Sequence, residues 1–286
     1  MSRLDIQKTY KLYIGGKFPR TESGRYFTIN DSKGNLIANM CLASRKDFRN
    51  AVVIARNAQS SWANSTALNK GQILYRIAEM LEGRKEQFMA ELIAQGETAA
   101  NAKTEVLNAI DRLVYYAGWS DKYQQFFSTV NPVSSSHFNF SIVEPVGVVA
   151  IIAPENQPLL GLISVIAPAI VGGNTVIVLA SETKPLTAIS FAEVLNSSDV
   201  PGGVVNILTG KKAELAGQMA SHMDVNSIIY CGTDEELMKS ISEAASHSVK
   251  RTIFYKKHEW INELCESPYL IEKTQEIKTT WHPTEI

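Results

Sequence analysis

The sequence predicts an α/β fold, in which a parallel sheet carries helices on both faces. After residue 146, β-rich runs alternate with helical segments near 158–171, 185–195, 213–221 and 234–245. The clearest runs are VGVVAII, NTVIVLA, VVNILT and NSIIYC, and RTIFY is a weaker fifth. Continuous apolar strands are typical of parallel sheets buried on both faces, and the helix between successive strands supplies the cover.

The first half of the chain predicts helices. From Phe48 to Trp62 the apolar residues recur at steps of three and four, and Ser44 with Asp47 three positions later has the pattern of an N-cap. Further helices are expected near 73–81, 86–92 and 103–127, the last with apolar positions at Val106, Leu107, Ile110 and Val114. We expect these helices to cover the sheet.

The segment between the two halves predicts an extended ribbon. Phe138, Phe140 and Ile142 alternate with polar residues, which is the period of a strand with one buried face. Two interpretations are open: an ordinary edge strand, or a projecting ribbon that buries its apolar face against another chain. The run TQEIKTTW, near the end of the sequence, is also strand-like.

Composition excludes several classes of protein. The chain has 286 residues, about the length of two domains or of one large domain with an appendage. It has 45% hydrophobic residues, 20% charged residues and a net charge of -1. A charge balance this close to zero gives no general attraction to nucleic acid or to an anionic membrane. The longest apolar stretch, 159–171, is too short to span a bilayer, and the polar N-terminus has no secretory signal. A cytoplasmic protein is expected.

Few residues have the spacing of a catalytic or metal site. Cys41, Cys231 and Cys265 lie far apart and are odd in number, which argues against a disulfide framework and a zinc site. The five histidines show no ligand spacing, so no metal is expected. Cys231 follows a strand, where we expect a small apolar residue packed beneath the sheet rather than a nucleophile. Neither G-x-G-x-x-G nor the P-loop motif occurs.

A doubly wound sheet binds ligands at the carboxyl ends of its strands, so the loops there are the places to look for a site. The loop after the first strand holds Glu155 and Asn156 just before a helix N-terminus, where backbone N–H groups could meet an anion or a cofactor. Gly210 opens the loop after the third strand, and either a phosphate contact or a simple turn into the next helix explains it.

Several segments occur in one order along residues 10–251: KLYIGGKF, ILYRIAEMLEGRKEQF, EPVGVVAIIAPENQPLL, GNTVIVLASETKPLTA, PGGVVNILTG and ASHMDVNSIIYCGT. This colinear series resembles the NAD(P)-dependent aldehyde dehydrogenase superfamily. The resemblance implies a Rossmann-like cofactor domain. It also implies roles for single residues: Asn156 matches the amide that stabilises the thiohemiacetal oxyanion, and Glu155 stands where the family's P-W-N motif has tryptophan.

The cofactor motifs of the family are only partly kept. In K-P-S-E, Leu179 replaces the lysine that bonds the cofactor ribose, while Glu182 is retained. The family's F-T-G-S, beside the cofactor phosphates, appears as Tyr-Cys-Gly-Thr, which keeps Gly232 and the hydroxyl of Thr233. With Gly210, which matches the family's glycine loop loosely, these residues form a vestigial cofactor set. The resemblance therefore implies weak NAD or NADP binding, or none.

The catalytic half of the family is missing. Beyond Arg251 the family continues with E-L-G-G-K, which holds the general-base glutamate, and then with the domain that carries the nucleophilic cysteine. This chain has YKKHE at 255–259 instead, and TQEIKTTW then resembles the end of the family's C-terminal tail. The chain thus resembles an internally truncated member, like the degenerate second module of the family-16 type, with no intact catalytic set beyond Asn156.

The resemblance implies four parts of the chain. They are N-terminal strands and helices over 1–128, an oligomerisation ribbon over 129–145, a Rossmann-like sheet over 146–257, and a connector with a C-terminal oligomerisation strand over 258–286. We expect a pseudoenzyme or non-catalytic subunit that forms a homodimer or joins a full-length aldehyde dehydrogenase through Phe138, Phe140, Ile142 and the C-terminal strand. The alternative is an NAD(P)-dependent aldehyde oxidoreductase component completed by a partner's catalytic domain.

Overall fold

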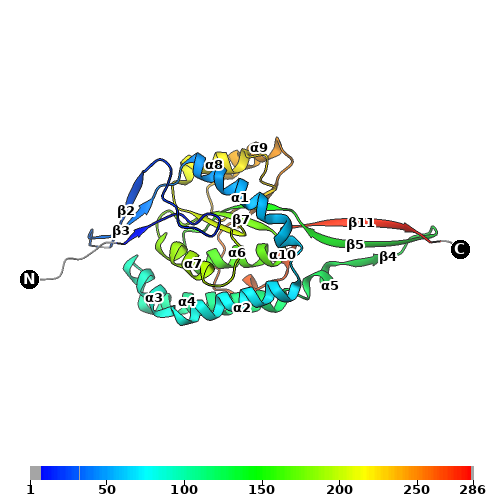
Figure 1. The fold of residues 1–286 in the computed structure, drawn as a ribbon, viewed down its shortest axis with the longest axis horizontal. Helices are drawn as coiled ribbons and strands as arrows, with labels where there is room; N and C mark the ends of the chain where they lie inside the picture. The colour runs from blue at the N-terminus through cyan, green and yellow to red at the C-terminus, as the bar shows by residue number, and fades with distance from the viewer. Residues whose placement is uncertain (1–7, 32, 285–286) are drawn as a thin grey trace, which may run out of the picture.

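The computed structural model of the protein describes residues 8–31 and 33–284. Its centre is a five-stranded parallel sheet in the order β10-β9-β6-β7-β8 (Figure 1). The strands are β6 Val148–Ile152, β7 Thr175–Leu179, β8 Val205–Leu208, β9 Ser227–Tyr230 and β10 Arg251–Phe254. The predicted α/β fold is confirmed, and all five predicted runs form strands of this sheet.

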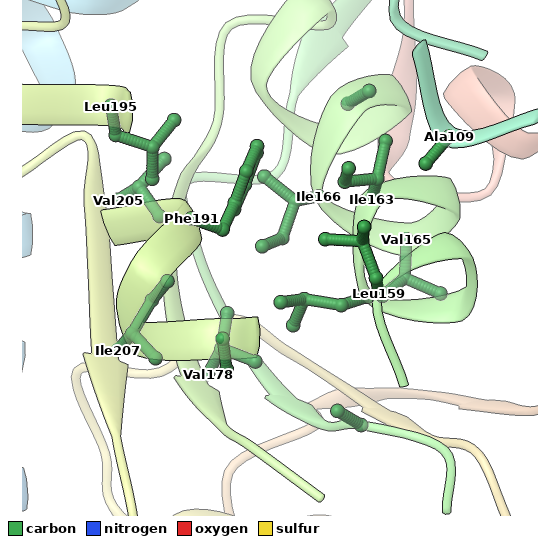
Figure 2. Close-up of a cluster of buried hydrophobic side chains, with 14 of the residues drawn as sticks. Ala109, Leu159, Ile163, Val165, Ile166, Val178, Phe191, Leu195, Val205 and Ile207 are labelled. Carbon is green, nitrogen blue, oxygen red and sulfur yellow. The ribbon is translucent and has the colours of Figure 1, made fainter. Parts of the chain in front are cut away.

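Two hydrophobic cores lie on opposite faces of the sheet, because successive side chains of each strand point to opposite sides. Figure 2 shows part of the first core, where Val178 and Ile207 of the sheet meet Ile166 and Phe191. The helices that contact the sheet strands on this side are α6 Leu160–Val171 and α7 Leu186–Asn196. The second core is covered by α1 Arg45–Ala63, α8 Lys212–Ser221 and α9 Glu235–Ser246.

The remaining N-terminal helices form an outer layer. They are α2 Ala67–Gly83, α3 Lys85–Ala94, α4 Ala99–Trp119 and α5 Tyr123–Phe127. Helices α2 and α4 pack on α6, and α3 packs on α7, whereas only α1 of the N-terminal helices contacts the sheet strands extensively. Of the helices expected to cover the sheet, α1 packs on its strands, whereas α2, α3 and α4 pack on its helices α6 and α7.

The predicted helix over 103–127 is two helices. Helix α4 ends at Trp119, and the Ser120 hydroxyl donates to the carbonyl of Ala117 where the chain turns into α5. The buried stripe of α4 also differs from the prediction, since Leu107 and Val114 are exposed. Leu107 follows buried Val106, and Val114 follows buried Leu113. One step along an α-helix rotates the side chain by about 100°, which turns both residues away from the core.

The predicted start of the first long helix is confirmed. The Ser44 hydroxyl accepts from the Asp47 amide, and the Asp47 carboxylate accepts from the Ser44 amide at 2.8 Å. Asp47 also accepts from the hydroxyl of Thr21, which ties the N-terminal segment to α1. This reciprocal capping box satisfies two backbone N–H groups that α1 cannot bond internally.

Replacing Ser44 with alanine is expected to lower the free energy of unfolding by about 1 kcal/mol, because one N-terminal amide of α1 loses its acceptor. Urea unfolding followed by circular dichroism measures the change. Ser60→Ala, on the exposed side of the same helix, is the matched control and should leave stability nearly unchanged. Equal effects of the two substitutions would contradict the role given to the cap.

A small N-terminal sheet extends the fold beside β8. Its strands are β1 Thr9–Tyr10, β2 Tyr26–Asn30 and β3 Leu36–Cys41, in the order β1-β3-β2. Tyr13 forms an antiparallel bridge to Ile207 on β8, so this sheet is joined to the parallel one. Cys41 ends β3 and is buried.

A three-stranded arm projects from the α/β body (Figure 1). Its strands are β4 Thr129–Asn131, β5 His137–Pro145 and β11 Gln275–Pro283, in the order β11-β5-β4. Because β5 is the central strand, the edge-strand interpretation is wrong. The apolar face predicted for β5 is open in this chain: Phe138 is 46% exposed and Ile142 is 39% exposed.

Between β10 and β11 runs a connector, residues 255–274, with the short helices η1 Glu263–Cys265 and α10 Tyr269–Glu272. In the part of the chain that the structure describes, every helix is too short or too polar to cross a bilayer.

Candidate functional site

A cavity of about 390 Å³ lies at the carboxyl ends of β6 and β9, where a doubly wound sheet places its ligand. The residues that line it are Pro154, Glu155, Asn156, Lys212, Tyr230, Cys231, Gly232, Thr233, Asp234, Tyr255, Lys257, His258 and Trp260. The structure thus brings together four residues that the resemblance singles out: Glu155, Asn156, Gly232 and Thr233. Four of the lining residues belong to the connector, which the sequence did not place at the site.

Asn156 lies at the cavity, but its amide group is already engaged. The Nδ2 atom donates to the carbonyl oxygen of His258 at 3.3 Å. The neighbouring Gln157 side chain accepts from the amide of Ile261 at 3.1 Å, so that the connector is held to this loop at two points. The one donor that matches the family's oxyanion amide is therefore turned toward the connector's own backbone.

The N-terminus of α6, directly after this loop, is also occupied from within. The carboxylate of Glu105, from α4, accepts from the amides of Leu159 and Leu160 at 2.8 and 3.2 Å. Burial raises the pKa of Glu105 to about 7, although these two hydrogen bonds oppose the shift. The expectation that this helix N-terminus meets an external anion or cofactor is wrong, because an internal carboxyl group takes the position.

Glu155, the residue in place of the family's tryptophan, is bound by the next loop along the sheet edge. Its carboxylate accepts from the hydroxyls of Ser181 and Thr183 at 2.7 and 2.6 Å, and pairs with the ammonium of Lys212 at 2.5 Å. Burial alone would raise the pKa of Glu155, but Lys212 and the hydroxyl donors outweigh burial and lower it to about 2. The group is ionised at neutral pH.

The retained Glu182 is likewise engaged. Its carboxylate accepts from the Lys211 ammonium at 2.9 Å and from the Lys212 amide at 3.0 Å, which caps the N-terminus of α8. Leu179 is fully buried in the second core, so its side chain packs between the sheet and its helices and offers no polar group to the cavity. Gly210 does not line the cavity, and a Cβ added there would meet Leu215 and Ala43.

The loop after β9 has an acidic end. Gly232 lies against the ring of Tyr230, with which an added Cβ would collide, and Thr233 is followed by Asp234, the N-cap of α9. Glu235 and Glu236 continue in the first turn of that helix. These carboxylates stabilise the helix N-terminus and give the loop a negative charge.

The thiol of Cys231 lines the cavity floor but is buried among apolar residues. Burial raises its pKa far above the usual range, and Lys212 offsets only part of the shift. Cys231 is thus a packed thiol, as the sequence predicts, rather than a thiolate. Within 8–31 and 33–284, histidine, cysteine and carboxylate side chains form no cluster of three that could hold a metal ion.

Arg112 organises the connector and was missed by sequence reasoning. The guanidinium, 1% exposed, donates to the carbonyl oxygens of Trp260 and Cys265 at 2.9 and 3.2 Å and to the Ser164 hydroxyl at 2.6 Å. It also pairs with Glu266 at 3.3 Å. A signal existed, since Arg112 lies on the apolar stripe of its helix, where a charged residue must find buried partners.

The fold and cavity define a class: α/β proteins with a dinucleotide-type domain and a ligand cleft at the carboxyl edge of a doubly wound sheet. Within that class, the family model described as "Aldehyde dehydrogenase family" matches residues 18–255. The chain belongs to the aldehyde dehydrogenase family.

Curated relatives agree with this assignment. The chain is 34% identical to mouse cytosolic 10-formyltetrahydrofolate dehydrogenase over 257 residues, which cover 88% of this chain and 28% of the relative. It is 34% identical to the putative aldehyde dehydrogenase DhaS of Bacillus subtilis (strain 168), with 86% of this chain and 50% of that protein covered.

Solved structures show the same likeness. The NAD+ complex of aldehyde dehydrogenase from Bacillus cereus superposes with a TM-score of 0.82 at 26% identity, over 87% of this chain and 51% of that one. PnpE from Pseudomonas sp. WBC-3 superposes with the same TM-score at 28% identity, over 86% and 50%. The chain therefore spans half the length of these proteins, and less than a third of the mouse relative.

Proposed function

We propose that this chain is a non-catalytic aldehyde dehydrogenase-like subunit. Acyl chemistry on a cysteine needs a thiolate, a base and an oxyanion donor at one point. At this cavity the matching donor, Asn156, is bound to the His258 carbonyl, and the Cys231 thiol is buried with a raised pKa. The single observation that carries the proposal is the hydrogen bond from Asn156 to the connector's backbone, which engages the donor that matches the family's oxyanion amide.

The residues present do not fit an NAD or NADP cofactor. Leu179 packs in the core, and the Glu182 carboxylate is committed to Lys211 and to the start of α8. Loss of one charge-assisted hydrogen bond to the ribose costs about 1.5 to 3 kcal/mol, which weakens binding by about 10-fold to 150-fold. We therefore propose weak or absent dinucleotide binding.

The purified chain is expected to show no aldehyde oxidation with NAD+ or NADP+ across a panel of aldehydes. Absorbance of the reduced cofactor measures turnover, and calorimetric titration measures binding. Turnover that Cys231→Ala abolishes and Cys41→Ala preserves would overturn the proposal. Micromolar affinity for NAD+ would instead favour the alternative, an oxidoreductase component completed by a partner's catalytic domain.

The arm supports a role in assembly. Phe138, Phe140 and Ile142 form an apolar face on a projecting strand, and β11 is an edge strand of the arm within the residues that the structure describes. Exposed apolar strands invite pairing with another chain. We propose that the arm docks by strand addition onto a full-length aldehyde dehydrogenase, with a homodimer of this chain as the second possibility. We place this assembly in the cytoplasm, in line with the names of its cytosolic relatives.

Replacing Phe138 and Phe140 with serine is expected to release the partner while the free energy of unfolding changes by less than about 1 kcal/mol, because these side chains lie outside both cores. Affinity capture from the native cell and light scattering of the pure chain measure assembly. Tyr75→Ser, an exposed aromatic on α2, is the control. A monodisperse wild-type monomer without a partner, or a double variant that keeps its partner, would contradict this role.

A further inference from the structure

The turn after β7 forms a cradle of hydrogen-bond donors. Two of its donors are backbone amides, those of Glu182 and Thr183, and two are hydroxyls, those of Ser181 and Thr183. The ammonium of Lys212, from the start of α8, completes the set. Neighbouring amides, hydroxyls and one cation that converge on a point are the groups that bind phosphate and similar anions.

The cradle is filled by a carboxylate from the same chain. Glu155 Oε2 accepts from Ser181 Oγ at 2.7 Å and from the amide and hydroxyl of Thr183 at 3.0 and 2.6 Å. Its Oε1 accepts from the Glu182 amide at 3.1 Å and meets Lys212 Nζ. All five donors are thus directed at the side chain of Glu155, which belongs to the loop after β6.

The cradle adjoins the main cavity. Glu155 and Lys212 both line the cavity that also holds Gly232 and Thr233, so an anion bound in the cradle would lie at the edge of that space. A phosphate-bearing ligand must displace the Glu155 carboxylate and overcome its charge to reach these donors. The replacement of the family's lysine by Leu179 would not by itself fill the cradle. The Glu155 carboxylate is the group that occupies it.

We propose that Glu155 is an internal anion that fills a phosphate-binding cradle, and that this residue determines whether phosphate-bearing ligands enter the cavity. The ligand class is a phosphate or pyrophosphate group, free or part of a nucleotide. This inference goes beyond the absence of catalysis, because it assigns a binding site to the Ser181–Thr183 turn and Lys212.

The test is calorimetric titration of the full chain with inorganic pyrophosphate. The wild type is expected to bind weakly, and Glu155→Ala to bind at least tenfold more tightly. Adding Lys212→Met to Glu155→Ala should remove the gain. Glu243→Gln, an exposed carboxylate on α9, is the control for a general change of charge and should resemble the wild type.

Circular dichroism melting establishes that each variant is folded. If Glu155→Ala does not fold, the nearly isosteric Glu155→Gln takes its place, with a smaller gain expected because its amide still fills the cradle. Equal pyrophosphate affinity of the wild type and the folded variant would overturn the proposal, as would a gain that persists without Lys212. Two assays of the wild type separate this result from the proposed function. Tight NAD+ binding or aldehyde turnover that depends on Cys231 would contradict the proposed function, whatever the pyrophosphate titrations give.

Discussion

Replacing Arg112 with methionine is expected to lower the free energy of unfolding by about 3–5 kcal/mol, the range for removing one partner of a buried charge network. The substitution leaves the carbonyl oxygens of Trp260 and Cys265 and the Ser164 hydroxyl without their donor, and an unmet buried acceptor is costly. The connector should detach from α6 and uncover the cavity.

Urea unfolding measures the stability change, and limited proteolysis within 255–268 measures the detachment. Arg76→Met is the matched control, because Arg76 is half exposed and pairs with Glu79 on its own helix. This substitution should cost less than about 1 kcal/mol. Arg112→Lys should fall between, since an ammonium cannot reach all the acceptors of a planar guanidinium. A loss below 1 kcal/mol in Arg112→Met would show that the connector is held by other contacts.

Glu105→Gln is expected to stabilise the protein at pH 8 by up to about 3 kcal/mol and to change little at pH 4.5, relative to the wild type. The pKa of Glu105 is about 7 in the folded chain, above its ordinary value of 4.5, chiefly because of burial. Between these pH values the folded state holds more protons than the unfolded state. The contribution of Glu105 is therefore fully present below pH 4.5 and is lost as pH rises through 7.

Glutamine keeps an oxygen that accepts from the amides of Leu159 and Leu160 and never ionises, so the variant escapes this loss. The nearby charges, Glu97 and Lys184, pair with each other in the wild type, and the substitution leaves both residues in place. Chemical unfolding of wild type and variant at several pH values between 4.5 and 8 gives the difference curve, with exposed Glu79→Gln as control. Parallel stability curves for wild type and Glu105→Gln would contradict a raised pKa at this site.

The parallel sheet was predictable from sequence because its strands are apolar at every position. A strand such as β7, buried on both faces, leaves a continuous run that no surface helix would show. The outer helix α4 was harder. One of its faces packs on α6 and its exposed face also carries apolar residues such as Leu107, so that the pattern did not identify the buried side or the break before α5.

The candidate site was predictable only in part. Asn156 and the Gly232–Thr233 pair were placed through the family resemblance, and strand order brings their loops together. The contacts of Arg112 and Glu155 could not be read from local patterns. Arg112 contacts the connector and Glu155 contacts the start of α8, so both sets of contacts join segments far apart in the chain. Such contacts depend on the tertiary fold and leave no local pattern in the sequence.

In the arm, β5 has one neighbour close in sequence and one distant. Asn131 of β4 pairs with Asn139 across a short turn, whereas Pro145 pairs with Gln275 and His137 with Pro283. During synthesis β5 therefore emerges with its second edge unpaired. Almost half of the chain must be synthesised after β5 before β11 can pair with this edge. Pairing over such separations is slow, because loop closure must precede the contact. The nascent chain thus exposes an unpaired strand edge, and a chaperone or a neighbouring nascent chain can bind this edge before β11 does.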